Sequence, residues 1–164
     1  MSKARRPSKG SAQASRPRTA REQETTTKRR GELAELAFVL KAASLGFGVA
    51  KPYGDSERYD FIVDSGQTLS RVQVKSSSTL LNGLYRINAH RRTAHGVVPY
   101  DPSEVDFMAA YVIPDDAWFI IPIAITTTRT SLLLCPYDWP RGDGLYGAYR
   151  EAWHLMREPD GLTF

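Results

Sequence analysis

Apolar residues recur at helical spacing between residues 26 and 45. One row falls at i, i+3, i+4, i+7, i+10 and i+11 and comprises Leu33, Leu36, Ala37, Leu40, Ala43 and Ser44. A second row, Phe38, Val39 and Ala42, lies three, four and seven residues beyond Glu35. Thr26 or Thr27 suits the N-cap, and Gly46 follows the last turn. The two rows predict a largely buried helix on which the Glu35 carboxylate requires a partner or a metal.

Residues 59 to 77 have the pattern of a β-hairpin. Two runs of β-branched and apolar residues flank Asp64-Ser65-Gly66-Gln67, a segment rich in turn formers. Side chains alternate across a strand, so polar residues gather on one face of each strand. These are Asp60 and Asp64, beside Ile62, on the first strand and Arg71, Gln73, Lys75 and Ser77 on the second, with Val72 and Val74 on the opposite side. We expect the two polar faces to meet.

Shorter apolar runs predict the remaining elements. We expect strands at residues 47–52, 84–88, 105–113, 117–121 and 131–135, a turn at Pro114, an irregular loop at 89–103 and a closing helix at 145–156. The pattern is that of a mixed α/β domain.

Charge is distributed unevenly along the 164 residues, a length that suits one domain. Residues 1 to 30 hold ten Lys/Arg and two Glu, which gives +8, whereas the remainder holds 12 Lys/Arg and 16 Asp/Glu, which gives −4. The first 25 residues lack hydrophobic periodicity, so we expect a disordered basic tail at 1–25 and a single domain at 26–164. Such an arm suits a phosphate backbone, and a solvated arm with no specific role is an equal alternative.

Two compositional features bear on the location of the protein. No apolar run approaches the ~18 residues of a membrane helix, so no membrane partner is expected. Cys135 is the single cysteine and has no partner for an internal disulfide, which favours a reducing, cytoplasmic setting.

Four polar residues have the chemistry of a metal-dependent site that cleaves phosphodiesters. Asp60 offers a carboxylate, Gln73 an amide oxygen, and the residue between Gln73 and Lys75 a backbone carbonyl, all suited to a hard cation such as Mg²⁺. Lys75 could orient a water and offset charge on a phosphate, and Glu35 could complete the metal shell. On spacing alone, an ordinary exposed strand face is the better explanation of the same residues, because an Asp at the start of a strand and a Gln-x-Lys on an exposed face are common.

Several motifs follow one another in a fixed order over roughly residues 28 to 125. They are Gly31-x-x-x-Glu35, Pro52-x-Gly54-Asp55-x-x-Arg58-Tyr59-Asp60, Arg71-Val-Gln73-Val-Lys75-Ser76, Glu104-Val-Asp106-Phe107 with Tyr111, and Ile121-Pro122-Ile123. In order and in kind they resemble the small PD-(D/E)xK endonucleases related to group I intron-encoded homing enzymes. That superfamily usually has Asp or Glu in place of Gln73, although Gln is typical of this branch. Glu32 competes with Glu35 for the helix position, and the family pattern favours Glu35.

The resemblance implies a restriction-endonuclease-like α/β core, a mixed β-sheet flanked by helices. It implies that Glu35, Asp60, Gln73 and Lys75 are catalytic and that Asp60, Gln73 and Glu35 hold Mg²⁺, with Mn²⁺ as an alternative. The partner would be double-stranded DNA, so the protein would associate with the nucleoid. Cleavage of both strands by single active sites favours a homo-oligomer.

The predicted function is therefore a Mg²⁺-dependent DNA endonuclease, with intron association implied by the resemblance alone. Arg58, Arg86, Arg91 and Arg92 are candidate DNA-binding residues, with solvated surface as the equal alternative. A catalytically weak or inactive nucleic-acid-binding module of the same fold is the second hypothesis. An unrelated α/β protein is the third.

Overall fold

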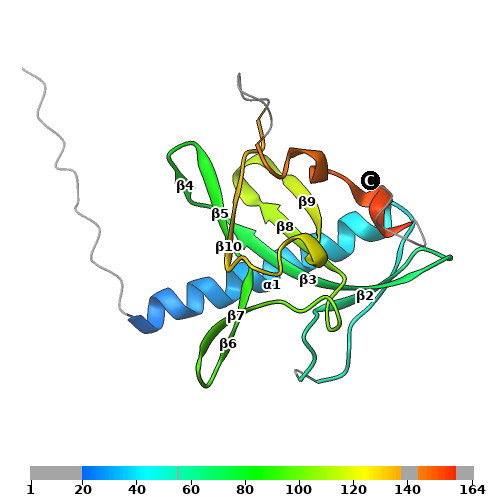
Figure 1. Cartoon of the computed structure of the whole chain (residues 1–164), viewed down its shortest axis with the longest axis horizontal. Coiled ribbons are helices and arrows are strands. Elements are labelled where there is room, and N and C mark those ends of the chain that lie inside the picture. The colour runs from blue at the N-terminus through cyan, green and yellow to red at the C-terminus, as the bar shows by residue number, and fades with distance from the viewer. Residues whose placement is uncertain (1–19, 55, 138–143, 158–164) are drawn as a thin grey trace, which may run out of the picture.

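The computed structural model describes residues 20–54, 56–137 and 144–157, which form one α-helix and ten β-strands (Figure 1). The helix is α1 (Ala20–Ser44). The strands are β1 (Gly48–Ala50), β2 (Phe61–Asp64), β3 (Leu69–Ser77), β4 (Leu80–Leu81), β5 (Leu84–Asn88), β6 (His90–Thr93), β7 (Gly96–Pro99), β8 (Phe107–Val112), β9 (Ala117–Pro122) and β10 (Ser131–Leu134). The predicted strands at 47–52, 84–88, 105–113, 117–121 and 131–135 are all present.

The central element is a five-stranded mixed sheet of order β1-β2-β3-β8-β9. Only β3 and β8 are parallel; the other neighbouring pairs are antiparallel. The predicted hairpin is confirmed, because β2 and β3 pair with Phe61 opposite Val72. Its turn is an Asx turn, in which the Gly66 N–H donates to Asp64 Oδ1 at 2.7 Å. This register brings Asp60 level with Gln73.

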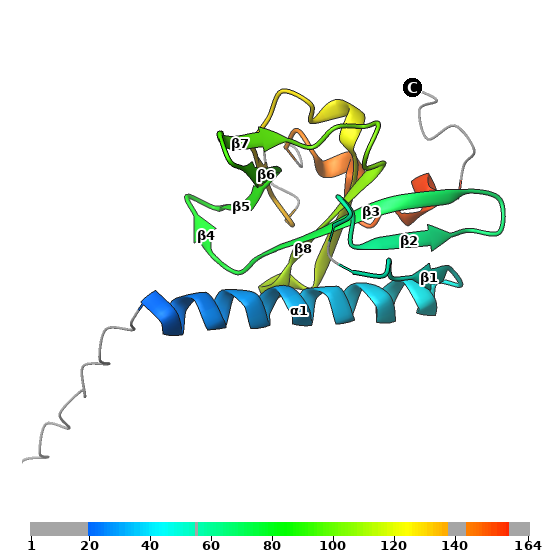
Figure 2. The ribbon, with the colours of Figure 1, turned by 90° about the horizontal axis from the view of Figure 1, so that it is seen from below.

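Helix α1 covers one face of the sheet through a row of buried residues, Ala34, Phe38 and Ala42 (Figure 2). The Phe38 ring packs against Phe61, with ring centroids 5.4 Å apart, and against Trp118 and Trp153, each at 5.7 Å. The leucine row predicted to be buried is instead exposed, so that prediction is wrong. The row with an aromatic side chain fills the space over the sheet, and the helix can bury only one face there.

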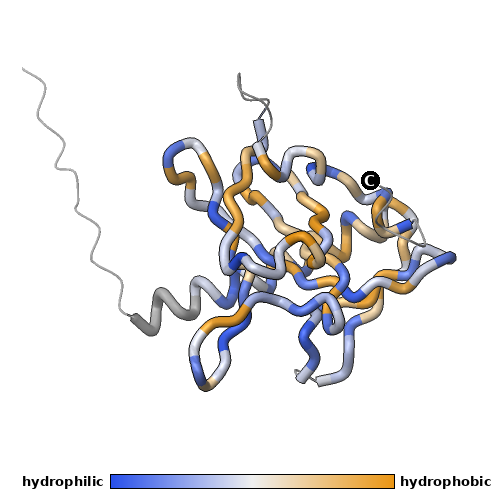
Figure 3. Tube along the Cα trace, in the orientation of Figure 1, coloured by the Kyte–Doolittle hydropathy of each residue, from blue (hydrophilic) through white to orange (hydrophobic). Residues whose placement is uncertain are grey.

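The opposite face of the sheet is covered by a second sheet, β10-β5-β4, and by turns. Figure 3 shows hydrophobic positions along β8 and β9, which are buried between the two layers. The helix predicted at 145–156 is absent, and two 3₁₀ turns, Gly147–Tyr149 and Trp153–Met156, take its place. Between them Glu151 has a φ of 50°, and its N–H donates to the Trp118 carbonyl of β9 at 2.8 Å. This tertiary contact outweighs the local helical preference.

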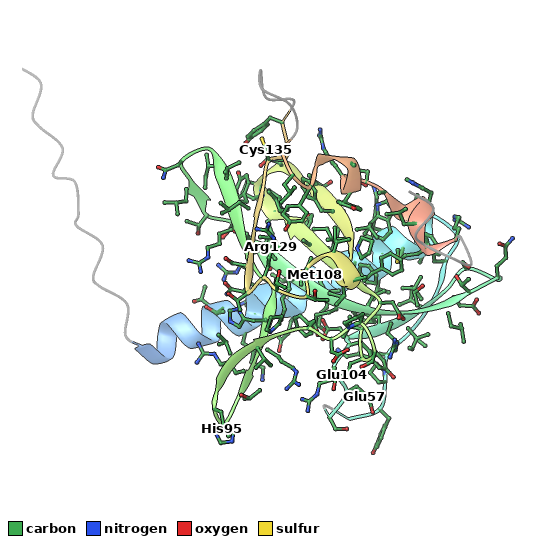
Figure 4. All side chains as sticks on the ribbon, in the orientation of Figure 1. Glu57, His95, Glu104, Met108, Arg129 and Cys135 are labelled. Carbon is green, nitrogen blue, oxygen red and sulfur yellow. The ribbon has the colours of Figure 1, made fainter. Side chains whose placement is uncertain are left out.

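The irregular loop predicted at 89–103 is also wrong, because β6 and β7 form a hairpin there. The Thr93 hydroxyl accepts a hydrogen bond from the His95 N–H at 3.2 Å, and Gly96 has a φ of 121°. His95 lies at the hairpin tip in Figure 4. The hairpin was not predicted because neither strand alternates apolar and polar residues: β6 is His-Arg-Arg-Thr, and β7 is the short run Gly-Val-Val-Pro.

Helix α1 begins at Ala20, before the N-caps predicted at Thr26 and Thr27. Residues 20–25, expected in the tail, are therefore helical, which agrees with the helix-forming composition Ala-Arg-Glu-Gln-Glu. The rest of the predicted tail, residues 1–19, lies outside the described residues. In the part of the chain that the structure describes, no helix is long and apolar enough to cross a membrane.

Candidate active site

A pocket of about 720 Å³ opens where β3 continues beyond the start of β2. Antiparallel pairing with β2 stops at Val72, whereas β3 runs on to Ser77 beside β8. The other edge of β3 is thereby left open toward α1. The lining comprises Thr27, Arg30, Gly31, Ala34 and Glu35 of α1, then Asp60, then residues 73–79, and finally Arg86, Asn88, His90, Arg91, Arg92 and Tyr100. The four predicted catalytic residues, Glu35, Asp60, Gln73 and Lys75, thus share one pocket.

The Asp60 carboxylate lies over the open edge of β3. Its Oδ2 accepts a hydrogen bond from the Val74 N–H at 2.7 Å, and also one from the Gln73 side-chain amide. The Asp60 N–H donates to the Val72 carbonyl at 2.9 Å, which extends the hairpin ladder by one bond. The backbone therefore fixes this carboxylate in place before any ligand binds.

Burial raises the pKa of the Asp60 carboxyl, because a charged carboxylate loses solvation in the pocket. The hydrogen bond from the Val74 N–H opposes this increase, whereas the nearby negative charge of Glu35 adds to it. The positive charges of Lys75 and Lys51 lower the same pKa. An under-solvated carboxylate with a second acidic group nearby favours binding of a cation.

The Gln73 amide occupies the position where a cation would be expected. Its Nε2 donates to Asp60 Oδ2 and also to the Val74 carbonyl, the latter at 3.3 Å. An anionic carboxylate oxygen and a backbone carbonyl oxygen therefore converge on one point. A divalent metal at that point would have two oxygen ligands, and rotation of the Gln73 amide would supply Oε1 as a third. The residues present thus fit a hard metal ion.

This donor set depends on an amide and a backbone carbonyl. Within the described ranges, no group of three or more His, Cys, Asp or Glu side chains is arranged to hold a metal ion. Mg²⁺ keeps several waters and needs only one or two carboxylates, so Asp60, Gln73 and the Val74 carbonyl form a sufficient set.

Glu35 lies on the α1 side of the pocket and carries an ion pair. Its Oε2 is 2.8 Å from Lys51 Nζ, and this contact raises the pKa of the Lys51 ammonium group. Lys51 therefore neutralises Glu35 in this structure. Glu32, the competing helix carboxylate, does not line the pocket.

Lys75 projects from β3 into the same pocket. Its Nζ lies 5.5 Å from the centroid of the Tyr100 ring, within cation–π range. Tyr100 is buried and follows β7, so the β6–β7 segment contributes a wall that positions the ammonium group.

Three of the four predicted DNA-binding arginines, Arg86, Arg91 and Arg92, line the pocket. Arg58 does not, and its Nε lies 3.8 Å from Glu104 Oε1. Arg91 Nε lies 3.8 Å from the other oxygen of Glu104, so this one carboxylate faces both arginines.

Two basic residues of the site were not identified from the sequence. Arg30 lines the pocket and its Nη1 donates to Ser78 Oγ at 3.3 Å, and Lys51 pairs with Glu35. Arg30 precedes Glu35 on the same helix, so there was reason in the sequence to expect it near the site. There was no such reason for Lys51, because only tertiary packing brings β1 beside α1.

Arg71 and Asp106, which belong to two of the sequence motifs, contact each other in the structure. Arg71 Nη2 lies 2.7 Å from Asp106 Oδ1, and the Arg71 N–H donates to Asp106 Oδ2 at 2.7 Å. These contacts tie β3 to the start of β8. They hold in register the strand that carries Gln73 and Lys75.

Comparison with known proteins identifies a protein family and a similar solved structure. The model of the PD-(D/E)XK endonuclease family matches residues 25–155. Among solved structures, the bacterial homing endonuclease I-Ssp6803I is similar with 32% sequence identity and a TM-score of 0.70, over 80% of this chain and 93% of that one. No curated protein matches significantly.

Proposed function

Because this chain belongs to the PD-(D/E)XK endonuclease family, we propose that it is a Mg²⁺-dependent endonuclease of double-stranded DNA, with Mn²⁺ as an alternative ion. The family resemblance and the restriction-endonuclease-like fold predicted from the sequence are confirmed by the two matches. The described residues contain one α-helix, which covers one face of the sheet, whereas a sheet flanked by helices had been expected. Similarity to a homing endonuclease supports nuclease activity in general.

The observation that carries the proposal is the convergence of Asp60 Oδ2 and the Val74 carbonyl on the Gln73 amide. Asp60, Gln73 and the Val74 carbonyl would hold the metal, with Glu35 nearby. A bound divalent cation would supply an acidified water and a positive charge beside the scissile phosphate. Gln73 would rotate to present Oε1 in place of its donor group.

The chain's own residues would provide the remaining chemistry. The Lys75 ammonium has three donors, enough to orient a water and to contact a phosphate oxygen. Lys51, 2.8 Å from Glu35, would compete with a divalent cation for that carboxylate. Arg30, Arg86 and Arg92 would offset phosphate charge along the rim of the pocket.

Plasmid cleavage tests this assignment. Purified wild-type protein, Asp60→Ala and Lys75→Ala are incubated with supercoiled plasmid in Mg²⁺ or in a chelator, and DNA binding is measured in parallel. We expect wild-type cleavage only with metal, and neither variant to cut although both bind DNA. Equal cleavage by all three would contradict the site, and binding without cleavage by the wild type would favour the non-catalytic binding module.

Substitution of the arginines tests the DNA-binding surface. In Arg86→Ala and in Arg92→Ala, the slope of the logarithm of the DNA association constant against the logarithm of the salt concentration should become shallower by about 0.9 per lost phosphate contact. The control is Arg129→Ala, because Arg129 is exposed and is not among the residues that line the pocket (Figure 4). Equal slopes in all three variants would contradict the predicted contacts. Arg58, outside the pocket, stays a prediction.

A further inference from the structure

The outward face of α1 carries a row of exposed leucines. Leu33, Leu36 and Leu40 are 57%, 66% and 74% exposed. Their spacing of three and four residues puts them on one face, opposite to buried Ala34, Phe38 and Ala42. Figure 2 shows α1 along one side of the molecule with its outer face uncovered. Contiguous exposed apolar surface of this kind marks an interaction site.

An apolar depression of about 420 Å³ adjoins this leucine row. Its walls are formed by Leu36, Val39, Val49 and Phe61, with Glu32, Glu35 and Lys51 at its rim. The row and the depression together form one continuous surface. At the rim Glu35 and Lys51 pair with each other at 2.8 Å, so their charges do not repel an approaching copy.

Neither the N-terminal segment nor DNA is a suitable occupant. Residues 1–19 contain no Leu, Ile, Val, Phe, Trp or Tyr, so they lack side chains that would pack on leucine. The pocket is lined by Thr27, Arg30 and Ala34, which lie on a different face of α1 from the leucines. A phosphate backbone would gain nothing from an apolar row.

We propose that the leucine row is a dimer interface, on which α1 of a second copy packs antiparallel. Positions 33, 36, 40 and 43 have the a and d spacing of a helix-pairing seam. Antiparallel pairing places Leu36 opposite the partner's Leu40, and Leu33 opposite the partner's Ala43. Each large end residue then meets a small one, so the row is complementary to itself.

Electrostatics favour the same orientation. Exposed Arg29 continues the row beyond Leu33, and antiparallel pairing brings its guanidinium to the C-terminal end of the partner helix. The unpaired carbonyls at a helix C-terminus carry partial negative charge and attract cations. A parallel pair would bring the two Arg29 side chains together, and their like charges would oppose it.

The proposed dimer leaves the active-site pocket of each copy open, because Thr27, Arg30 and Ala34 line that pocket from a different face of α1 and only Glu35 borders both the pocket and the depression. It supplies a surface for the predicted homo-oligomer without depending on nuclease activity. Two copies related by a two-fold axis would present two sites to one duplex.

Sedimentation of the full chain between about 1 and 100 µM tests the dimer without DNA. We expect the wild type to dimerise and Leu36→Lys to weaken association at least tenfold, with circular dichroism unchanged. The matched control is Leu69→Lys, since Leu69 is 68% exposed at the start of β3 and lies outside the row. A monomeric wild type, or equal association of both lysine variants, would overturn the proposal.

Cysteine cross-linking tests the orientation. A mixture of Leu36→Cys and Leu40→Cys chains should form an oxidised dimer more efficiently than either variant alone. Native Cys135 is buried, and wild-type chains should give no such product. Preferential self-cross-linking of Leu36→Cys, as in a parallel pair, would overturn the antiparallel arrangement.

Discussion

Replacing Gln73 by Glu separates the two roles that the structure gives to this side chain. In the metal-free protein, the Gln73 amide donates to the partly buried Asp60 carboxylate and to the Val74 carbonyl. Gln73→Glu removes these donor hydrogens and places a second negative charge beside Asp60. A hydrogen bond to a charged group contributes about 1.5–3 kcal/mol, so the metal-free variant should be less stable by at least that amount.

The expected shift in melting temperature follows from that loss. For a chain of this size, 1 kcal/mol corresponds to roughly 2–4 °C, so Gln73→Glu should melt about 3–12 °C below the wild type in a chelator. Divalent metal should stabilise Gln73→Glu more than it stabilises the wild type, since the added carboxylate attracts a cation. We expect the midpoint of a Mg²⁺ titration, followed by thermal melting, to fall at least tenfold, which corresponds to about 1.4 kcal/mol.

The control is Gln67→Glu, which makes the same charge change at an exposed position in the β2–β3 turn. It should alter neither the chelator melting temperature nor the Mg²⁺ midpoint. If metal-free Gln73→Glu melted with the wild type, the amide contact to Asp60 would be wrong. If its Mg²⁺ midpoint matched that of the wild type, Gln73 would not be a metal ligand.

Three further predictions concern charge and packing. Burial raises the pKa of Asp60, so the stability that this carboxyl contributes is present below its unfolded-state pKa of about 3.9 and is lost as pH rises through its folded-state pKa. In denaturant unfolding, Asp60→Asn should therefore be more stable relative to the wild type at pH 7 than at pH 4, and the same difference at both pH values would contradict this. Lys51→Met removes the cation that competes for Glu35, so the variant should bind Mg²⁺ about fivefold more tightly in a titration, a Coulomb effect near 1 kcal/mol. An unchanged Mg²⁺ affinity would refute the competition. Phe38→Ala should cost about 3–5 kcal/mol in denaturant unfolding and Leu40→Ala less than about 1 kcal/mol, and equal losses would contradict the burial of the Phe38 row.

The hairpin that carries the site could be predicted because its information is local. Alternation along β3 and the turn residues after Asp64 determine which side chains share a face. Asp60 and Gln73 then meet because the register is set by that turn. The convergence of their side chains therefore needed no knowledge of the rest of the fold.

Predictions failed where tertiary contacts chose among locally similar alternatives. Both apolar rows of α1 have helical spacing, and burial of Phe38 between Phe61 and Trp153 decides which row faces the sheet. The segment at 145–156 has helical periodicity, yet contact with β9 at Glu151 breaks it into two turns.

The sequence by itself determined the β2–β3 hairpin, the strands β1, β5, β8, β9 and β10 and the group of Glu35, Asp60, Gln73 and Lys75, but not β4, β6 and β7. Alternation, turn chemistry and motif order are read directly along the chain. Only the tertiary structure decided that Lys51 neutralises Glu35 and that the leucines of α1 face outward. Each depends on packing between elements distant in sequence, where the shape and volume of side chains decide the contacts. Periodicity shows that a helix has an apolar row, but it does not show which surface will cover that row.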